Sequence, residues 1–262
     1  MDYAGQWTSD DRTDHQVASL AEISRFYVRA LKARFRDHRP EFDAIKRHIR
    51  AGDIVCDVGA NKGSFTYWLS RWCGENGRLI AFEPQPRLAH RLAVVCADIG
   101  LRNVTVEAKA VHSSSGLGEL YIPSGQRPGA SLNRSPRSTG KFDTLPVPVI
   151  SLDEYFKENE RISLLKIDVE GAELEVFWGA RRILEECSPA LIFECEARHL
   201  IGKSVSDVFA YLESLGYRGR FFCDGEARPL STFSVASHQR QEGKWFWKQK
   251  NYCNNFIFTK DV

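Results

Sequence analysis

The sequence lacks any apolar run close to the roughly 20 residues that a membrane-spanning helix needs. Its first residues, MDYAGQWTSDDRTDHQ, are polar and contain no apolar core of the kind that signal peptides carry. The seven cysteines include no C-x-x-C pair, and Cys56 and Cys195 fall inside apolar runs, where a reduced thiol packs as a small hydrophobe. We therefore expect a cytoplasmic protein with no membrane span, no disulfide framework and no structural zinc.

A charge excess of one sign is also missing. The chain has 36 basic and 34 acidic residues and a formal net charge of +2. A protein whose main partner is nucleic acid usually carries a clear basic excess, so we expect no nucleic-acid partner, although a local basic patch is compatible with these numbers. No G-x-S-x-G occurs, which removes the usual nucleophile turn of α/β hydrolases.

Short apolar runs alternate with longer amphipathic segments along most of the chain. Residues 16–50 show apolar side chains at three-and-four spacing, which predicts an N-terminal helical extension over residues 1–50. Helices are then predicted at 64–74, 86–100, 151–159, 172–187 and 204–217. Strands are predicted at 53–60, 78–84, 103–111, 162–171, 189–197, 219–224 and 254–260.

This alternation predicts an α/β fold with a mainly parallel sheet of seven strands and helices on both faces. The last two strands are joined by a polar loop, which favours one antiparallel edge strand. Residues 112–149 are rich in Ser, Gly, Pro and Arg and interrupt the rhythm. Because the rhythm resumes afterwards, we expect them to form short strands on the rim of one domain, residues 51–262.

The first apolar run ends in Asp57 and turns over Gly59 and Gly63 into a predicted helix. Glycines permit such a bend and let a ligand approach the backbone closely. Asn61 stands where the G-x-G-x-x-G pattern of dinucleotide sites has its second glycine. An acid directly before the bend suits a cationic ligand such as S-adenosylmethionine. The alternative is a plain turn in which Asp57 hydrogen-bonds its own loop.

Two further runs end in residues suited to an adenosine. Glu83 ends the second strand about 20 residues after the glycine turn, where an acid accepts hydrogen bonds from both ribose hydroxyls. The alternative is a surface carboxylate before Pro84. After the third run, Ala110 is the candidate to flank the adenine.

The densest charge cluster, KIDVEGAE, follows the fourth run. Strand alternation points Lys166 and Asp168 the same way and places Glu170 at the strand tip. Charged side chains inside an apolar strand must be ion-paired or serve a function, which applies to Lys166 and Asp168. The position of Glu173, in contrast, is explained by the dipole of the following helix, which favours acids at its start. After the fifth run, ECEARH supplies Glu194, Glu196 and His199 at the same rim.

The segments DVGANKGSFT, AFEPQP, VPVISLDEY and LLKIDVEGAELEVFWGA resemble the FkbM family of S-adenosylmethionine-dependent methyltransferases. The similarity runs from about residue 51 to 217, with a final strand at 255–259, and keeps the order of four motifs. It implies the class I, Rossmann-like methyltransferase fold. Family members are mostly O-methyltransferases acting on hydroxyls of sugars, glycolipids or polyketide-type natural products.

The resemblance also implies residue roles. Glu83 would hold the ribose, and Lys166 to Glu173 would lie beside the transferred methyl group. The methionine moiety would be lined by Asp57, Gly59, Asn61 and Gly63. Acceptor choice is expected in the N-terminal helices, in residues 112–149 and in WFWKQKNY, residues 245–252, which lie outside the shared pattern or interrupt it.

Methyl transfer requires the enzyme to align two substrates, exclude water and remove a hydroxyl proton. We expect Asp168 or His199 to take that proton beside Lys166, and Glu170 and Glu194 to orient a small-molecule acceptor. Four alternatives stay open at this point. They are a divalent metal held by the acid cluster, an RNA ribose methyltransferase, an NAD-dependent oxidoreductase, and a binding scaffold without activity.

Overall fold

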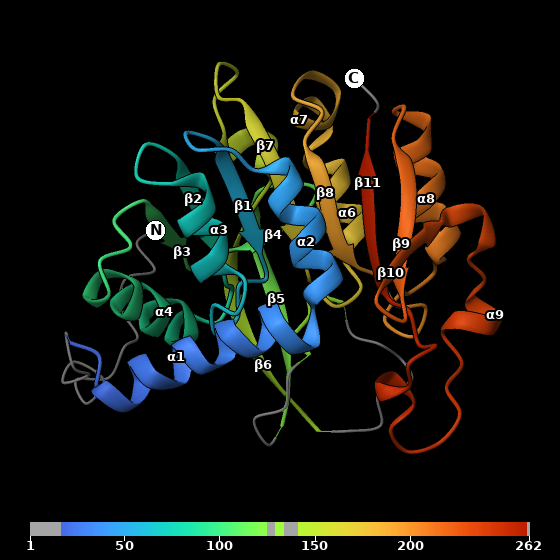
Figure 1. Ribbon diagram of the computed structural model, residues 1–262, viewed down its shortest axis with the longest axis horizontal. Coiled ribbons are helices and arrows are strands. Elements are labelled where there is room, and N and C mark those ends of the chain that lie inside the picture. Colours follow the sequence, from blue (N-terminus) through green and yellow to red (C-terminus); the bar gives the residue numbers. More distant parts are fainter. Residues whose placement is uncertain (1–16, 125–128, 134–140, 261–262) are drawn as a thin grey trace.

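The computed structural model describes residues 17–124, 129–133 and 141–260. In this part of the chain the main sheet is built from eight strands: β1 Ile54–Val58, β2 Arg78–Phe82, β3 Val104–Glu107, β7 Ile162–Ile167, β8 Ala190–Glu194, β9 Arg218–Cys223, β10 Glu226–Pro229 and β11 Asn255–Thr259. They lie in the order β10-β9-β11-β8-β7-β1-β2-β3 (Figure 1). The run from β3 to β8 is parallel, with β1 at the centre between β2 and β7.

The antiparallel part of this sheet differs from the prediction in two ways. β11 is antiparallel to both β8 and β9, so the antiparallel strand is inserted between two others and is not at the edge. β10 pairs with β9 and adds an eighth strand that was not predicted. A turn at Asp224–Gly225 joins β9 to β10, and Asp224 has a φ of +50° and Gly225 of +84°. This short hairpin had been assigned to the polar loop.

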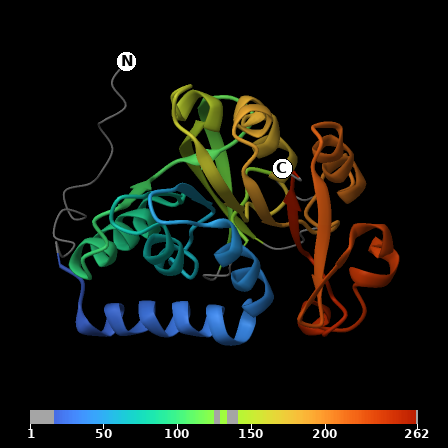
Figure 2. The same cartoon turned by 45° about the horizontal axis from the view of Figure 1, so that its top comes forward.

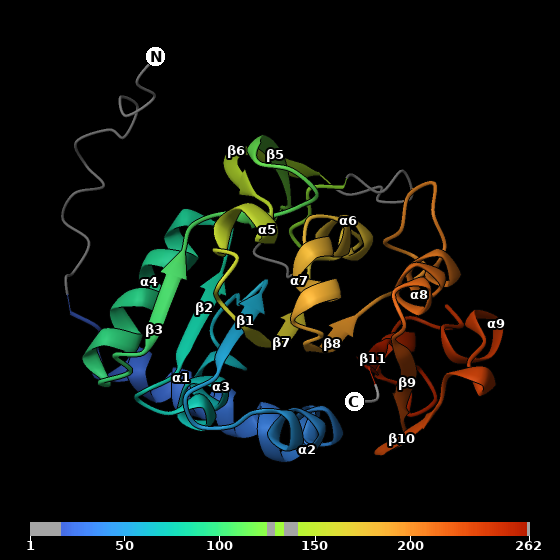
Figure 3. The same cartoon turned by 90° about the horizontal axis from the view of Figure 1, so that it is seen from above.

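Helices cover both faces of the main sheet, as Figure 3 shows. One face carries α1 Leu20–Lys32, α2 Arg39–His48, α3 Thr66–Cys73 and α4 Pro86–Asp98. The other carries α5 Leu152–Tyr155, α6 Glu173–Trp178, α7 Arg181–Glu186 and α8 Val205–Ser214. The period of two along the strands explains the two cores: Leu164 packs towards α2 and α3, and Leu165 packs towards the opposite helices. Among the described residues, no helix is long and apolar enough to cross a membrane.

The predicted N-terminal helix is divided in the structure. A short π-helical segment, Ala33–Asp37, separates α1 from α2, and Pro40 lies in the first turn of α2, where a proline is tolerated. α2 packs on β7, β8 and β11 through Phe42 and Ile45, which are fully buried. The N-terminal helices therefore share the core of the main sheet.

Between residues 110 and 150, the described residues form a second, three-stranded sheet. β5 Gly116–Pro123 pairs antiparallel with β6 Phe142–Ile150, and β4 Ala110–Val111 pairs parallel with β6. The segment predicted as one strand at 103–111 thus forms two strands: β3 belongs to the main sheet and β4 to the second sheet. Ala110, Leu120 and Val147 form a small core of its own. Parts of the predicted rim segment, residues 125–128 and 134–140, lie outside the described residues.

The helix predicted at 172–187 is two helices. Gly179 and Ala180 separate them, and residue 179 is a glycine because a Cβ there would stand 2.1 Å from the carbonyl oxygen of His112. The carboxylate of Asp153 caps the start of α7: it accepts hydrogen bonds from the backbone amides of Arg182 and Ile183 at 2.8 and 3.1 Å.

One cysteine pair was not predicted, although the expectation concerned a disulfide framework and not a single bond. The structure pairs Cys223, at the end of β9, with Cys253, just before β11, with their Cα atoms 5.4 Å apart. The two residues are 30 positions apart in the chain, so a search for closely spaced cysteines could not find them. The antiparallel pairing of β9 with β11 brings them together.

Candidate active site

The turn after β1 is held by backbone contacts with the neighbouring strands. The amides of Gly59 and Ala60 both donate to the carbonyl of Phe82, at 2.9 Å each, which ties the turn to the end of β2. Gly59 has a φ of +79°, and a Cβ built on it would stand 1.8 Å from the carbonyl oxygen of Asp168. Only glycine lets the turn lie this close to the end of β7.

Gly63 is a glycine for a different reason. A Cβ at Gly63 would stand 2.6 Å from side-chain atoms of Leu92 in α4 and Phe26 in α1. Gly63 therefore serves the packing of these helices against the turn. Asn61, with a φ of +48°, lies in the left-handed region that asparagine tolerates better than most residues.

Glu83 is buried at the end of β2 with its carboxylate held in place. Its two oxygens accept hydrogen bonds from the backbone amides of Asn61 and Gln85, at 2.9 Å each. Burial raises the pKa of Glu83 to about 7, although the hydrogen bonds from Gln85 and Asn61 act to lower it. Each oxygen keeps a further lone pair for a ligand hydroxyl.

Lys166, Asp57 and Asp168 form a charge cluster between β1 and β7. Lys166 Nζ lies 3.2 Å from Asp168 Oδ2, and Asp57 is the register partner of Lys166 on the adjacent strand. Burial acts to lower the pKa of Lys166, but the charges of Asp168 and Asp57 outweigh it, and the pKa is raised. Burial raises the pKa of Asp57, against the charge of Lys166 and a 2.8 Å hydrogen bond from Thr66. The lysine thus stays charged, with Phe65 under its ammonium at 4.9 Å.

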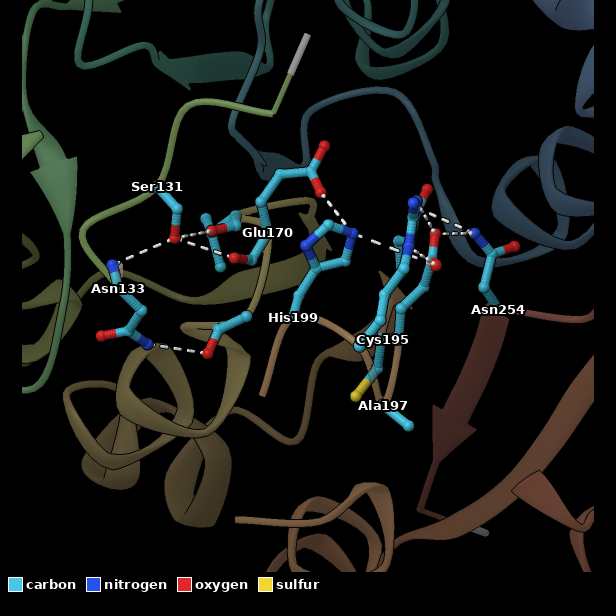
Figure 4. A network of polar contacts seen from close by, with 12 residues as sticks. Ser131, Asn133, Glu170, Cys195, Ala197, His199 and Asn254 are labelled. Atoms are coloured by element: carbon cyan, nitrogen blue, oxygen red, sulfur yellow. Dashed lines mark hydrogen bonds and ion pairs between the residues drawn. The ribbon is translucent and has the colours of Figure 1, made fainter. Parts of the chain in front are cut away.

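A loop from the second sheet is attached to the acid motif (Figure 4). Ser131 Oγ donates to the carbonyl of Glu170 at 2.8 Å, and Asn133 Nδ2 donates to that of Gly171 at 2.8 Å. Glu170 has a φ of +55° and Gly171 of +102°, so the chain reverses here and presents both carbonyls to the loop. Residues 129–133 are thereby positioned over the end of β7.

The side chain of Glu170 meets His199 across the same rim (Figure 4). His199 Nε2 lies 3.2 Å from Glu170 Oε2 and 3.9 Å from Glu196 Oε2. Burial, and then the charges of Asp168 and Glu196, raise the pKa of Glu170 to about 8. Burial and the neighbouring Arg198 lower the pKa of His199. At neutral pH, therefore, the carboxyl group carries a proton and the imidazole is neutral.

Glu194 and Glu196 belong to a network behind this pair. Asn254 Nδ2 donates to Glu194 at 2.8 Å and to Glu196 at 2.9 Å. Burial raises the pKa of Glu194 well above its ordinary value. For Glu196, hydrogen bonds from Arg198 and Tyr252 outweigh burial and lower the pKa. The pKa values of the two acids are thus shifted in opposite directions, although both accept a hydrogen bond from Asn254.

The glycine turn, Glu83 and the acid motif line one pocket at the carboxyl ends of β1, β2 and β7. It encloses about 760 Å³ outside protein atoms, part of it open solvent. The second sheet forms one wall through Leu120 and residues 129–132. Six predicted site residues are among those that line it: Gly59, Asn61, Glu83, Ala110, Asp168 and Glu170.

The other predicted residues are near the pocket but are not among its lining residues. Asp57 and Lys166 lie in the buried charge cluster, and Gly63 faces the helices. His199 and Glu194 lie one layer further out, behind Glu170. Among the described residues, no group of three or more His, Cys, Asp or Glu side chains has an arrangement suited to a metal ion.

Several contributing residues were not found from the sequence. Ser131 and Asn133 lie in the Ser- and Gly-rich interruption, which has no periodicity to set them apart. Arg198 and Tyr252 act only through the fold, which brings residues 196 and 252 together. The aromatic content of WFWKQKNY was the only signal for the second of these.

Comparison with known proteins identifies this arrangement. A family model described as the methyltransferase FkbM domain matches residues 57–218. The chain belongs to the FkbM methyltransferase family. The resemblance inferred from the four motifs is thereby confirmed.

Two curated relatives of this FkbM-family protein are less than 30% identical to it. A hexuronic acid methyltransferase, AglP of Haloferax volcanii, is 27% identical over 184 residues, covering 66% of this chain and 72% of that protein. The methyltransferase sdnD of Sordaria araneosa is 29% identical over 208 residues, covering 64% of this chain and 73% of that protein.

Solved structures support the class I methyltransferase fold. A crystal structure of an FkbM methyltransferase from Methylobacillus flagellatus aligns with a TM-score of 0.50 at 15% identity. The alignment covers 93% of this FkbM-family chain and 56% of that one, so this chain spans little more than half of that structure.

Proposed function

We propose that this protein transfers a methyl group from S-adenosylmethionine to a hydroxyl group of a small sugar-type or polyketide-type molecule. One observation carries the proposal. Glu83 and Asp168, from the ends of β2 and β7, line the same pocket, with the glycine turn between them. A ribose-binding acid and an acid suited to proton removal thus share one cavity.

The residues present fit S-adenosylmethionine. Backbone amides fix Glu83 so that its free lone pairs are available to the two ribose hydroxyls. Gly59 and Asn61 offer a turn without bulky side chains for the methionine end, and Ala110 lines the pocket for the adenine. Asp57, by contrast, would act through the cluster beneath the turn. When bound, S-adenosylmethionine supplies an electrophilic methyl group on a good leaving group.

Asp168 is the group we assign to removing the acceptor's proton. It lines the pocket, and its Oδ2 lies 3.2 Å from Lys166, which is buried and charged. Lys166 acts here as a positioning residue that fixes the carboxylate. Deprotonating the hydroxyl as the new C–O bond forms is the part of the reaction that a positioned base accelerates.

Glu170 and His199 orient the acceptor in this proposal. Glu170 lines the pocket and is protonated at neutral pH, so it donates a hydrogen bond to an acceptor oxygen. His199 Nε2 faces Glu170, which favours a positioning role for His199 over that of the base.

The charge of the pocket bears on the acceptor class. AglP is named for a hexuronic acid, which is anionic. In this chain the proposed base Asp168 lines the pocket as a carboxylate, and the lining lysine, Lys109, is paired with Glu107 at 2.8 Å. Like charges repel, so we propose that a neutral hydroxyl acceptor is preferred over its uronic acid form.

The test is methyl transfer measured by mass shift over neutral sugars, the matching uronic acids and polyketide-type alcohols. Asp168→Asn should lower kcat by about 10²- to 10⁴-fold, while thermal stabilisation by S-adenosylmethionine is retained. Glu213→Gln, an exposed acid on α8, is the matched control and should leave both unchanged. Stabilisation by NAD but not by S-adenosylmethionine would refute the proposal. If only RNA gained a methyl group, the acceptor would be an RNA ribose and not a small molecule.

A further inference from the structure

Helix α1 has a second apolar face whose side chains are largely exposed in the described structure. Its inner face is buried through Phe26 and Ala30. On the opposite side, Leu20 is 86% exposed, and Val28 and Leu31 are exposed on the same face. Two exposed apolar residues extend this face beyond the helix: Val17 before it, and Phe35 in the π-helical segment after it, where the Phe35 ring also contacts Trp68, with the ring centres 5.7 Å apart. These five residues form the outer stripe. Single exposed apolar residues are ordinary, but a continuous group along a helix and its ends marks a binding surface.

Basic residues flank the outer stripe. Arg25 and Lys32 are exposed and lie seven residues apart, which places them along one side of the helix. Of the neighbouring acids, Glu22 is ion-paired with Arg91 and Asp37 with Arg36. An apolar stripe with a basic flank is the composition of helices that lie in a membrane interface.

A second element of the same composition follows α9 Val235–His238. Trp245 is 55% and Trp247 40% exposed, and Lys248 Nζ lies 4.6 Å from the Trp245 ring centre. With Lys244 on its other side, this Trp segment, residues 244–248, combines tryptophan and lysine in the manner typical of membrane–water interfaces.

Both elements are anchored at the carboxyl edge of the main sheet. Arg29 of α1 donates to the carbonyl of Lys62 in the glycine turn at 3.3 Å. The Trp segment is held through Arg198, which lies over the ring of Trp247 and is ion-paired with Glu196 just beyond β8. Figures 1 and 2 show α1 and the segment between α9 and β11 along this same edge. The pocket is at the same edge, where β1, β2 and β7 end.

We infer that this edge docks on an anionic lipid surface, through the outer stripe and the Trp segment, with the pocket facing the lipid. A second copy of the chain is the weaker alternative. A two-fold pairing of outer stripes would bring Arg25 and Lys32 of one copy against those of the other, and like charges repel. Anionic headgroups complement the same residues.

Co-sedimentation of the full chain with vesicles tests the inference. The protein should bind vesicles of phosphatidylcholine mixed with phosphatidylglycerol and should bind pure phosphatidylcholine at least about tenfold more weakly. The paired substitution Arg25→Gln and Lys32→Gln should weaken binding to the mixed vesicles by on the order of tenfold. Leu31→Glu should abolish it, and Trp245→Ala with Trp247→Ala should weaken it.

The matched control is Leu117→Glu, an exposed apolar position on β5, which should bind as the wild type does. Equal binding to both vesicle types, or none, would overturn the inference. So would a lipid-free dimer that Leu31→Glu dissociates, or a large loss of lipid-free thermal stability in Leu31→Glu, since either shows that protein covers the stripe. The assay uses no methyl donor or acceptor, so its failure leaves the proposed function untouched.

Discussion

Replacing Lys166 by methionine tests whether the charges beneath the pocket act as one unit. Lys166 is 6% exposed, and the carboxylate of Asp57 beside it is 1% exposed. Methionine keeps an apolar stem of similar length and removes only the charge. Removing one partner of a buried ion pair costs about 3–5 kcal/mol because the other charge is left uncompensated. Asp168 is 35% exposed and screened by water, so we expect the lower end of this range. Lys166→Met should lower the free energy of unfolding by about 3 kcal/mol at pH 8.

The loss should depend on pH with a definite sign. The folded pKa of Asp57 is already raised above its ordinary value, so the folded state keeps this proton to higher pH than the unfolded state does. A group of this kind favours folding at low pH, and that contribution is lost as the pH rises through the folded pKa. Without Lys166 the folded pKa rises further. The destabilisation of Lys166→Met should therefore be smaller at pH 5 than at pH 8.

Urea unfolding of four proteins at both pH values measures this: the wild type, Lys166→Met, Asp57→Asn and the double variant. The double variant should recover most of the loss, because the neutral amide no longer needs a counter-charge. Lys157→Met, at an exposed position, should stay within about 0.5 kcal/mol of the wild type. Simple additivity of the two single losses, or a loss that does not change with pH, would refute the reasoning.

Three further predictions concern the walls of the pocket. Gly59→Ala should lower the free energy of unfolding by more than about 2 kcal/mol, because its Cβ would overlap the carbonyl of Asp168. Gly100→Ala, at a φ of +76° with open space around it, should lower it by only about 1 kcal/mol. Chemical denaturation measures both. The affinity for S-adenosylmethionine should fall as the pH drops below about 7, where Glu83 protonates, and calorimetry should find this dependence absent in Glu83→Gln. Asn133→Ala should raise the KM for the acceptor and leave the affinity for S-adenosylmethionine unchanged, because it releases the acceptor wall from the acid motif; equal losses for both substrates would contradict this.

The parallel half of the fold was predictable because its signals are local. Strands β1, β2, β7 and β8 are short apolar runs, each followed by a helix with a recognisable start or stop, such as the capping box of Ser204 in α8. The site residues that could be predicted come directly after these runs. Chain order alone places them at one edge of the sheet.

What could not be predicted depends on tertiary neighbours. The need for glycine at residue 179 follows from the carbonyl of His112, and the separation of β4 from β3 follows from its pairing with β6. Protonation states were equally out of reach. Whether Glu170 carries a proton depends on its burial and on Asp168 and Glu196 nearby, which no spacing in the chain reveals.

Between β3 and β4 the chain passes from the main sheet into the second sheet. These are two parts of the molecule whose sequences can change at different rates. Apart from Ala110 in β4, the residues that would hold the methyl donor follow strands of the main sheet, whose core is shared with the surrounding helices. The opposing wall belongs to the second sheet, which has its own small core and meets the pocket through Leu120 and residues 129–132. We expect substitutions or length changes in the β5–β6 hairpin to alter the depth and lining of the cavity more than the donor side. The second sheet is thus the part of the molecule in which we expect changes of acceptor to arise.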